Sequence, residues 1–277
     1  MEGGPFESTA IWNVNLDIKD GEFLGLIGHT GSGKSTLIQH MNGLLKPSEG
    51  TVIVNEIRIE KDSKNLRELR QQVGLVFQYP EHQLFEETVA LDIAFGPKNL
   101  GLSKAEIDLR VREAVQLVGL SFDEIKDRSP FELSGGQRRR VAIAGVLAMK
   151  PGILILDEPT AGLDPRGRDE IFNEISVLHK EQGYTIILVS HSMEDIARLA
   201  DRIIVMNQGQ IALTGTPKEV FAHAGELKEM GLDVPQVTNL MLALKEKGLD
   251  VPTDIYTVQQ AKAVLKQILE GGGNRRA

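Results

Sequence analysis

Nine residues that follow an apolar run have the types and the spacing of a phosphate-binding loop. The run is Phe23–Ile27, and the loop after it reads GHTGSGKST. Its three glycines allow tight turns and leave no Cβ between the backbone N–H groups and an anion. The pattern predicts a nucleoside triphosphate as the ligand and a helix whose positive end faces the phosphates. The predicted ligand-binding residues are Gly28, His29, Thr30, Gly31, Ser32, Gly33, Lys34, Ser35 and Thr36.

Hydrolysis of a triphosphate also needs metal ligands and a group that acts on water. Lys34 is expected to reach the β- and γ-phosphates, and Ser35 to bind Mg²⁺. A second apolar run, residues 153–156, ends in Asp157 and Glu158, as expected of a buried parallel strand. We expect Asp157 to hold Mg²⁺ and Glu158 to act as a general base or to polarise the attacking water. Without the loop, this string would be an ordinary strand with solvated charges at its end.

A third motif lies between these two. Residues 133–140 read LSGGQRRR and open a predicted helix, where Ser134 and two glycine amides form a second anion site. A serine N-cap alone leaves the paired glycines unexplained. The string resembles the signature motif of ATP-binding-cassette (ABC) ATPases. The resemblance implies that two chains enclose two ATP molecules head to tail, each signature closing over the partner's nucleotide through Ser134, Gly135, Gly136 and Gln137.

Three more residues match this family, and the resemblance covers about residues 10 to 220. Gln78, after the run 73–77, resembles the Q-loop glutamine, which contacts Mg²⁺ and water and senses the transport partner. His191, after the run 185–189, resembles the switch histidine that contacts the γ-phosphate. Asp164 resembles the D-loop aspartate that crosses the dimer interface. Alone, Gln78 or His191 would be a routine polar residue at a strand end; their order along the chain carries the assignment.

Periodicity predicts an α/β fold with a parallel core sheet, a small N-terminal antiparallel sheet and an inserted helical arm. The resemblance implies that this fold is of the P-loop NTPase type. Strands are expected at 11–18, 23–27, 51–54, 73–77, 153–157, 185–189, 202–206 and 210–214. Helices are expected at 34–45, 65–71, 89–96, 104–118, 138–149, 166–182 and 193–200. We expect an ABC ATPase domain over 1–219, with a helical subdomain at about 79–150.

After residue 220 the pattern changes to two short amphipathic helices, the second behind a capping box at Thr257–Gln260. The family resemblance implies that this extension, 220–277, holds two ATPase subunits together. The alternative is that both helices pack only on their own domain. Residues 271–277 are expected to form a loose tail. The family resemblance implies an extra strand at the start of the chain and an aromatic side chain that stacks on adenine. Only 27 residues precede Gly28, and Phe6 is expected to be too close to the loop to be that aromatic. We therefore expect weaker ATP binding than in a chain extended upstream.

Composition narrows the classes of function. The chain has 277 residues, a net charge of −8 and no cysteine. An acidic chain is a poor match for nucleic acid, and the basic triplet 138–140 is expected on a solvated helix face. The absence of cysteine excludes disulfides and fits a reducing compartment. No segment approaches the roughly 20 apolar residues that span a bilayer, and Met1–Gly4 begins no signal peptide. Any membrane role must therefore come through a partner.

Residues 77–89 and 92–97 (FQYPEHQLFEETV and DIAFGP) are more particular. They resemble the ATPases of energy-coupling factor (ECF) importers of vitamins and metals. The resemblance implies that Leu84, Phe85 and Phe95 line a groove for a helix of a transmembrane coupling subunit. The alternative is that they form the core of the helical arm. Residues 157–164, with Phe131 and Glu132, are more similar to the second of the two paralogous ATPases of such importers.

The resemblance implies a Mg²⁺-dependent ATPase at the cytoplasmic face of the cell membrane. Its expected partners are a paralogous ATPase, a transmembrane coupling subunit and a substrate-binding membrane subunit, with no nucleic acid. The main alternative is a homodimeric cobalt or nickel importer ATPase. Soluble ABC ATPases of DNA repair or translation carry a long coiled coil or two cassettes, which this chain lacks. A regulator without catalysis would be expected to lose Glu158 or His191, and both are present.

Overall fold

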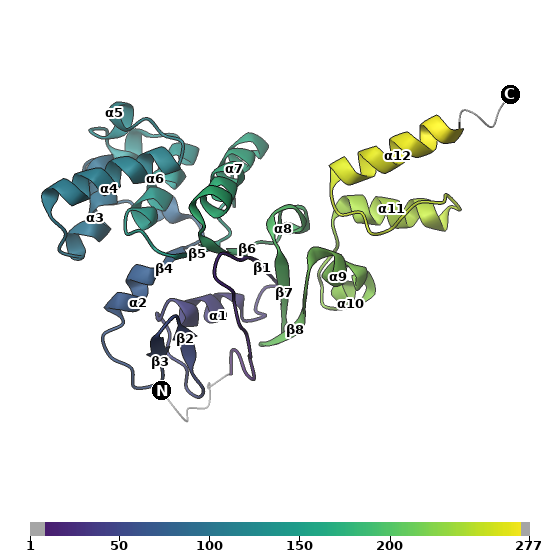
Figure 1. Cartoon of the computed structure of the whole chain (residues 1–277), viewed down its shortest axis with the longest axis horizontal. Helices are drawn as coiled ribbons and strands as arrows, with labels where there is room; N and C mark the ends of the chain where they lie inside the picture. Colours follow the sequence, from purple (N-terminus) through teal and green to yellow (C-terminus); the bar gives the residue numbers. More distant parts are fainter. Residues whose placement is uncertain (1–8, 273–277) are drawn as a thin grey trace. The chain divides into compact units, whose positions relative to one another are not determined.

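The computed structural model describes residues 9–272. It divides into two compact units, which are described in turn and are drawn with their element labels in Figure 1. The first unit comprises the described residues of Met1–Asp17, Phe23–Lys34 and Ser190–Ala277. The second comprises Ile18–Glu22 and Ser35–Val189. Each unit contains parallel strands that pair with one another, as the sequence predicts for an α/β fold.

Three parallel strands form the centre of the second unit: β4 (Val73–Val76), β5 (Ile153–Asp157) and β6 (Thr185–Val189). Strand β5 pairs with β4 on one side and with β6 on the other. Their nearly continuous apolar runs are typical of strands that are covered on both faces. Asp157 lies opposite Val189, so β5 and β6 end at the same edge of the sheet.

A separate antiparallel pair joins β2 (Val52–Val54) and β3 (Ile57–Ile59). This confirms the predicted small antiparallel sheet. Strand β3 was not predicted, because three residues that alternate with charged neighbours give too short a pattern. The turn between the strands contains Asn55, whose φ of 53° lies in the left-handed region that asparagine tolerates.

Helices complete the second unit. Helices α3, α4 and α6 pack against one another and form the predicted helical arm, drawn in teal in Figure 1. The apolar face of α4 is buried at Val111, Ala114 and Val115. The helices are α1 (Lys34–Met41), α2 (Arg67–Gln72), α3 (Val89–Asn99), α4 (Lys104–Leu117), α5 (Phe122–Ile125), α6 (Gly135–Leu147) and α7 (Pro165–Gln182), with short 3-10 turns η1 (Pro80–Gln83) and η2 (Pro130–Glu132).

The first unit contains β1 (Phe23–Ile27) paired in parallel with β7 (Arg202–Asn207), and β8 (Gln210–Gly215) antiparallel to β7. Helix α8 (Met193–Leu199) packs on β1 at Gly25, where a Cβ would lie 2.9 Å from Ile196 Cγ2. Glycine at this position therefore allows helix and strand to approach closely. Helices α9 (Pro217–Ala222) and α10 (Ala224–Glu229) follow β8.

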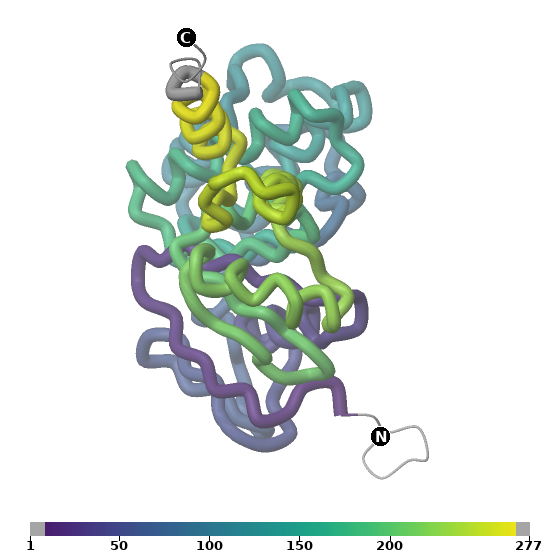
Figure 2. Tube along the Cα trace, turned by 90° about the vertical axis from the view of Figure 1, so that its right-hand side faces the viewer, coloured from purple at the N-terminus to yellow at the C-terminus, as the bar shows by residue number. Residues whose placement is uncertain are grey.

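The two predicted C-terminal helices are present as α11 (Gln236–Glu246) and α12 (Val258–Gly272), and Figures 1 and 2 show them side by side. The predicted capping box forms, since Gln260 N donates to Thr257 Oγ1 at 3.3 Å and Thr257 N donates to Gln260 Oε1 at 3.1 Å. The helices share a small core of Met241, Val251, Ile255 and Ala261. Each helix therefore covers part of the other's apolar face.

Four expectations differ from the structure or lie outside it. Residues 11–18 form no strand, since Trp12 N donates to the Gly209 carbonyl in a loop and Asp17 O accepts from the Arg202 guanidinium. Helix α1 ends at Met41, before a left-handed Gly43 that stops the helix. Phe6 and residues 273–277 lie outside the described residues.

Within residues 9–272, no helix is long and apolar enough to cross a membrane.

Candidate functional site

The loop between β1 and α1 has the closed shape that its glycines predict. A Cβ on Gly28 would lie 2.4 Å from Met206 O and 2.5 Å from Ser32 Oγ. Gly31 and Gly33 have φ values of 82° and 102°, which side-chain-bearing residues rarely adopt. The backbone of this loop is therefore turned in a way that only glycine permits at these positions, which is the property required for a nest of N–H groups.

Two side chains make the interior of the loop suitable for an anion. Lys34 is buried, and its Nζ donates to the carbonyls of Gly28 at 2.6 Å and His29 at 3.0 Å. The Ser32 hydroxyl is buried and has no hydrogen-bond partner in the structure. A phosphate oxygen would satisfy that hydroxyl and attract the ammonium group. The residues present therefore fit a bound triphosphate.

The loop histidine has an anchoring contact that was not foreseen. His29 Nε2 lies 3.2 Å from the Asn207 side-chain oxygen, and its Nδ1 lies 2.7 Å from the Thr30 carbonyl. Asn207 is the last residue of β7, so the contact ties the loop to the strand beside β1. No sequence pattern indicated this pairing, because the residues are far apart along the chain.

His191 lies in the same unit as the loop, on the segment that leads into α8. Its pKa lies below the ordinary value of 6.5, first because of partial burial and second because of the positive charge of Lys34. The imidazole is therefore neutral at pH 7, with one ring N–H as a donor and the other nitrogen as an acceptor. A neutral donor suits a contact to a phosphate oxygen.

The acid pair lies at the end of β5 in the second unit. Asp157 ends the strand, and Glu158 leaves it with a φ of 49°, in the left-handed region. The Glu158 N–H donates to Val189 O at 3.0 Å, which holds this conformation in place. A left-handed conformation at a non-glycine residue costs of order 1 kcal/mol and clusters at functional sites.

Gln78 is exposed just beyond β4, and the next residue, Tyr79, is also left-handed, with a φ of 55°. Together with Ser35 and Asp157, Gln78 would supply hydroxyl, amide and carboxylate oxygens, which are the ligands that Mg²⁺ prefers. In the described part of the chain, no group of three His, Cys, Asp or Glu side chains could hold a metal. The set of donors thus fits a magnesium ion that shares its coordination with phosphate oxygens.

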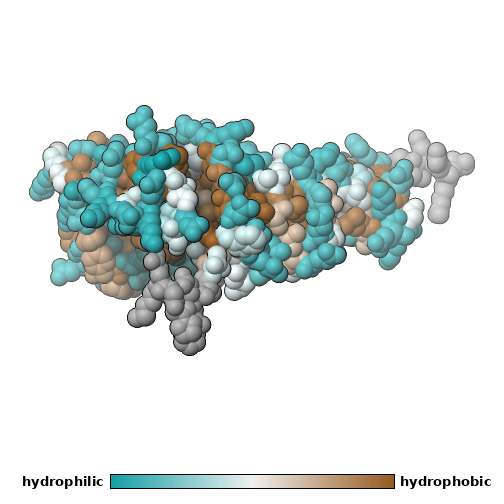
Figure 3. All heavy atoms as spheres, turned by 90° about the horizontal axis from the view of Figure 1, so that it is seen from below, coloured by the Kyte–Doolittle hydropathy of each residue, from teal (hydrophilic) through white to brown (hydrophobic). Residues whose placement is uncertain are grey.

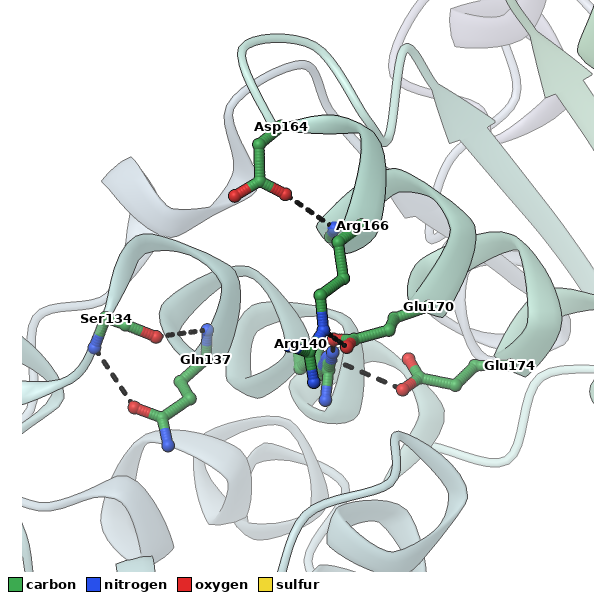
Figure 4. A network of polar contacts seen from close by, with 8 residues as sticks. Ser134, Gln137, Arg140, Asp164, Arg166, Glu170 and Glu174 are labelled. Atoms are coloured by element: carbon green, nitrogen blue, oxygen red, sulfur yellow. Dashed lines mark hydrogen bonds and ion pairs between the residues drawn. The ribbon is translucent and has the colours of Figure 1, made fainter.

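The signature motif forms the N-terminus of α6, seen from close by in Figure 4. Gln137 N donates to Ser134 Oγ at 3.3 Å, and Ser134 N donates to Gln137 Oε1 at 3.1 Å. This capping box holds the first turn. A Cβ on Gly135 or Gly136 would meet nothing within 4 Å, so both glycines face open space where an anion could approach.

Asp164 caps a second helix in Figure 4, and its Oδ1 accepts from Gly167 N at 2.7 Å at the start of α7. Arg140 of α6 contacts α7 through two glutamates. Its guanidinium pairs with Glu170, and its Nε lies 3.4 Å from Glu174 Oε1. Burial raises the pKa of Glu174 to about 7, and the Arg140 charge lowers it only in part. The predicted site residues Ser134 and Asp164 therefore lie on two helices that an arginine connects.

The prediction of a solvated face for the basic triplet is wrong for Arg139, which is only 1% exposed. Its guanidinium binds the Glu81 carboxylate and the carbonyl oxygens of Pro159 and Ala161. The contact residues follow the predicted site residues Gln78 and Glu158 closely along the chain, and the sequence analysis did not predict these contacts. The only signal in the sequence was that three arginines in a row cannot all point to one side of a helix.

Comparisons with known proteins agree with these motifs. The sequence profile of the ABC transporter family matches residues 11–161. The energy-coupling factor transporter ATP-binding protein EcfA2 of Clostridium tetani is 61% identical over 97% of this chain and 93% of its own length. EcfA2 of Clostridioides difficile is 59% identical over 98% of this chain and 95% of its own length.

Solved structures agree as well. The structure of cbiO1 from Clostridium perfringens, described as part of the ABC transporter complex cbiONQ, has a TM-score of 0.72 and 42% identity, covering 84% of this chain and 92% of that chain. A dimer of the cassette MJ0796 with ADP and Pi has a TM-score of 0.66 and 32% identity, covering 75% and 90% of the two chains. The fold and motifs are those of an ABC ATPase. The chain belongs to the ABC transporter family, in its energy-coupling factor ATP-binding branch.

We predict that replacing Glu174 with Gln changes how stability depends on pH. Because the folded pKa of about 7 lies above the ordinary 4.5, wild-type stability declines as the pH rises through this interval. The Gln variant lacks this ionisation. Its free energy of unfolding relative to wild type should therefore rise between pH 5 and 8, by roughly 1 kcal/mol after allowance for solvent screening. Urea unfolding at several pH values measures this, and a difference that stays constant would contradict the prediction.

Proposed function

We propose that this chain is the ATP-hydrolysing subunit of an ECF-type importer and works at the cytoplasmic face of the membrane. The observation that carries the proposal is the ordered set of a glycine cradle, an acid pair and a capped signature helix in a chain of the energy-coupling factor branch. The chain is a transport ATPase that converts ATP and water to ADP and phosphate. The uptake of a vitamin or another micronutrient through membrane subunits is the finer part of the proposal.

The signature helix supports a composite site formed by two subunits. The capping box uses the N–H groups of Ser134 and Gln137. Beyond the helix's own backbone, nothing lies within 4 Å of a Cβ placed on Gly135 or Gly136. A second anion site that is built but unused within one chain fits closure over a neighbour's γ-phosphate. We propose that Asp164, exposed at the N-terminus of α7, crosses the same interface.

The residues of the chain then divide the chemistry among themselves. Lys34 leaves the loop carbonyls to bind the β- and γ-phosphate oxygens, while the backbone N–H groups around Gly31 hold the triphosphate. Ser35, Gln78 and Asp157 would hold a magnesium ion, which would supply positive charge against the phosphates. Glu158, turned away from the strand, accepts a proton from the attacking water or polarises it, and neutral His191 donates to the γ-phosphate.

A patch on α3 and the segment before it supports docking to a membrane subunit. Phe85 and Phe95 are 59% and 45% exposed, and their rings meet edge to face with centroids 5.0 Å apart. Asp92 Oδ2 accepts from the N–H groups of Phe85 and Glu86, which fixes the patch. Leu84 is buried and belongs to the core, so of the three residues predicted to line the groove only Phe85 and Phe95 are available to a partner. An exposed aromatic pair held by the backbone is typical of an anchor for a partner helix.

The C-terminal extension supports a contact with another ATPase subunit. Although α11 and α12 share a core, Leu240, Val258 and Leu269 remain 49%, 67% and 77% exposed. The space-filling view in Figure 3 shows brown apolar side chains among teal ones next to the grey C-terminal atoms. We propose that the partner is the paralogous ATPase, forming a heterodimer. A homodimer, as in the alternative of a cobalt or nickel importer, is the other outcome.

We predict that Glu158→Gln abolishes turnover and preserves ATP binding, because the amide cannot accept a proton but keeps the size of the side chain. Turnover by the assembled transporter should fall by about 100-fold or more, while the dissociation constant for ATP stays within about threefold of wild type. Glu113→Gln, which changes a surface carboxylate paired with Lys150, is the matched control. Substantial hydrolysis by the Glu158 variant would remove this residue from its proposed role.

We predict that Phe85→Ser together with Phe95→Ser releases the chain from its membrane partner. Losing two exposed aromatic anchors should weaken association by about 30-fold or more, and co-purification from membranes reports the loss. Leu109→Ser, at a side chain that is 53% exposed on α4 of the same helical arm, is the control. Equal recovery of the double variant and the control would place the membrane contact elsewhere.

We predict that Leu240→Asp together with Leu269→Asp reduces association between ATPase subunits in the absence of nucleotide. Charged side chains would have to be buried without partners in the contact. Sedimentation velocity of the purified ATPase subunits should show a shift towards monomer. Ile53→Asp, at an exposed apolar position on β2, controls for the added charge. If the extension makes no such contact, both variants will sediment like wild type.

A further inference from the structure

Arg139 of the signature helix joins two loops that are far apart in the sequence. Its Nε and Nη2 donate to Glu81 at 3.0 and 2.7 Å, in a side-on pair. Its Nη1 donates to Pro159 O at 3.2 Å and to Ala161 O at 2.7 Å. All three guanidinium nitrogens are therefore used, and the side chain is 1% exposed. One planar group fixes both loops to α6.

Each acceptor stands next to a residue of the proposed site. Glu81 lies in η1, three residues after Gln78. The carbonyls of Pro159 and Ala161 lie between Glu158 and Asp164, and Ala161 N donates back to Glu158 O at 3.1 Å. If the segment after Gln78 moves while Glu81 stays paired with Arg139, then α6 or the loop at 159–161 must move with it.

Tyr79 forms a second link between the same loops. The Arg139 Cζ lies 5.9 Å from the centre of the Tyr79 ring. A Cβ on Gly162 would lie 3.6 Å from Tyr79 Cε1, so this ring also packs against the loop that leads to Asp164. The left-handed φ of 55° at Tyr79 turns the chain directly after Gln78. The contact between the loops is thus made by a ring as well as by a charge.

The electrostatics make the link stiff. Burial opposes ionisation of Glu81, but the hydrogen bonds and charge of Arg139 outweigh it, so the pKa of Glu81 lies below its ordinary value. Glu81 is therefore ionised at pH 7, and breaking its buried pair with the Arg139 guanidinium would leave an uncompensated charge out of water. A bidentate pair also fixes orientation, because guanidinium and carboxylate must stay coplanar. Sliding one loop past the other is therefore costly.

We infer that Arg139 is a positioning residue that couples the segment after Gln78 to the loop that carries Glu158 and Asp164 in the same subunit. A displacement of Gln78 by a membrane partner then reaches the water-activating carboxylate and the subunit interface through Glu81, Arg139 and the Pro159 and Ala161 carbonyls. The role of the coupling rests on the function proposed above, whereas the mechanical link rests on the contacts alone.

Hydrogen exchange of the full-length chain without nucleotide tests the link without reference to catalysis. Arg139→Gln should raise exchange at least about tenfold in residues 79–83 and 159–164, with β5 and β6 unchanged. Arg110→Gln is the matched control, because Arg110 also binds a carboxylate, of Glu106, and a carbonyl, of Met149. Exchange that rises throughout β5 as well, or that leaves both loops unchanged, would overturn the inference.

Kinetics of the assembled transporter tests the consequence. Arg139→Gln should lower kcat for ATP by about tenfold or more and leave KM within about threefold, since the triphosphate ligands are untouched. A double variant, Arg139→Met with Glu81→Leu, removes both charges. It should regain the stability that Arg139→Gln loses, but it lacks the hydrogen bonds to the two carbonyls. This double variant should fold like wild type and keep the low kcat; recovery of kcat would show that Arg139 only neutralises Glu81.

The two experiments separate failure of the inference from failure of the proposed function. If the wild-type assembly does not hydrolyse ATP, the proposed function is wrong, and hydrogen exchange still decides whether Arg139 holds the two loops. If the wild type hydrolyses ATP and Arg139→Gln turns over at the wild-type rate, the coupling is wrong and the function stands.

Discussion

The close approach of backbone to backbone around Gly28 is the constraint on which the phosphate loop depends. A single added carbon there would fall 2.4 Å from a carbonyl of the neighbouring strand β7, which no real structure tolerates. The loop can therefore turn its N–H groups inward only if β1, β7 and the loop are packed without side chains between them. A phosphate oxygen in the loop would then satisfy the unpaired hydroxyl of Ser32 and attract the buried ammonium group of Lys34.

Helix α6 organises the other half of the machinery. Its N-terminus is closed by a capping box, so the signature residues are held before any partner arrives. Its next turn sends Arg139 towards the loops after β4 and β5 and Arg140 towards α7. The loop of residues 159–164 is thus held at one end by Arg139 and at the other by the helix that Arg140 contacts. One helix sets the positions of the signature serine and of Asp164 together.

Two arginines of α6, Arg139 and Arg140, stabilise the charges of their carboxylate partners to different extents. Arg139 meets a carboxylate side-on and two carbonyls, and the pKa of its partner Glu81 is lowered. Arg140 divides its charge between two glutamates, and the more buried one, Glu174, has its pKa raised to about 7. The difference follows first from burial, which raises the pKa of Glu174 more than the charge of Arg140 lowers it. One guanidinium shared between two carboxylates offsets burial less than the side-on pair of Arg139 and Glu81 does. The first pair suits a rigid link, and the second adds a pH-sensitive contribution to stability.

Local patterns in the sequence were sufficient for the features that depend on neighbours along the chain. The glycines of the phosphate loop, the capping box of Thr257 with Gln260, and the apolar runs of β5 and β6 were predicted and are present. Each is determined by backbone sterics or by hydrogen bonds over three residues. Membership of the family followed from the order of these motifs.

Tertiary structure alone decided the features that join distant segments. Helical periodicity does not reveal which arginine of 138–140 meets Glu81, a residue 58 positions away, and the expected solvated face was wrong for Arg139. It likewise did not separate buried Leu84 from exposed Phe85, or predict the left-handed turn at Glu158. These outcomes depend on which groups compete for the same buried space. That competition is settled only when the strands and helices pack, because desolvation is imposed by the whole fold and not by the local chain.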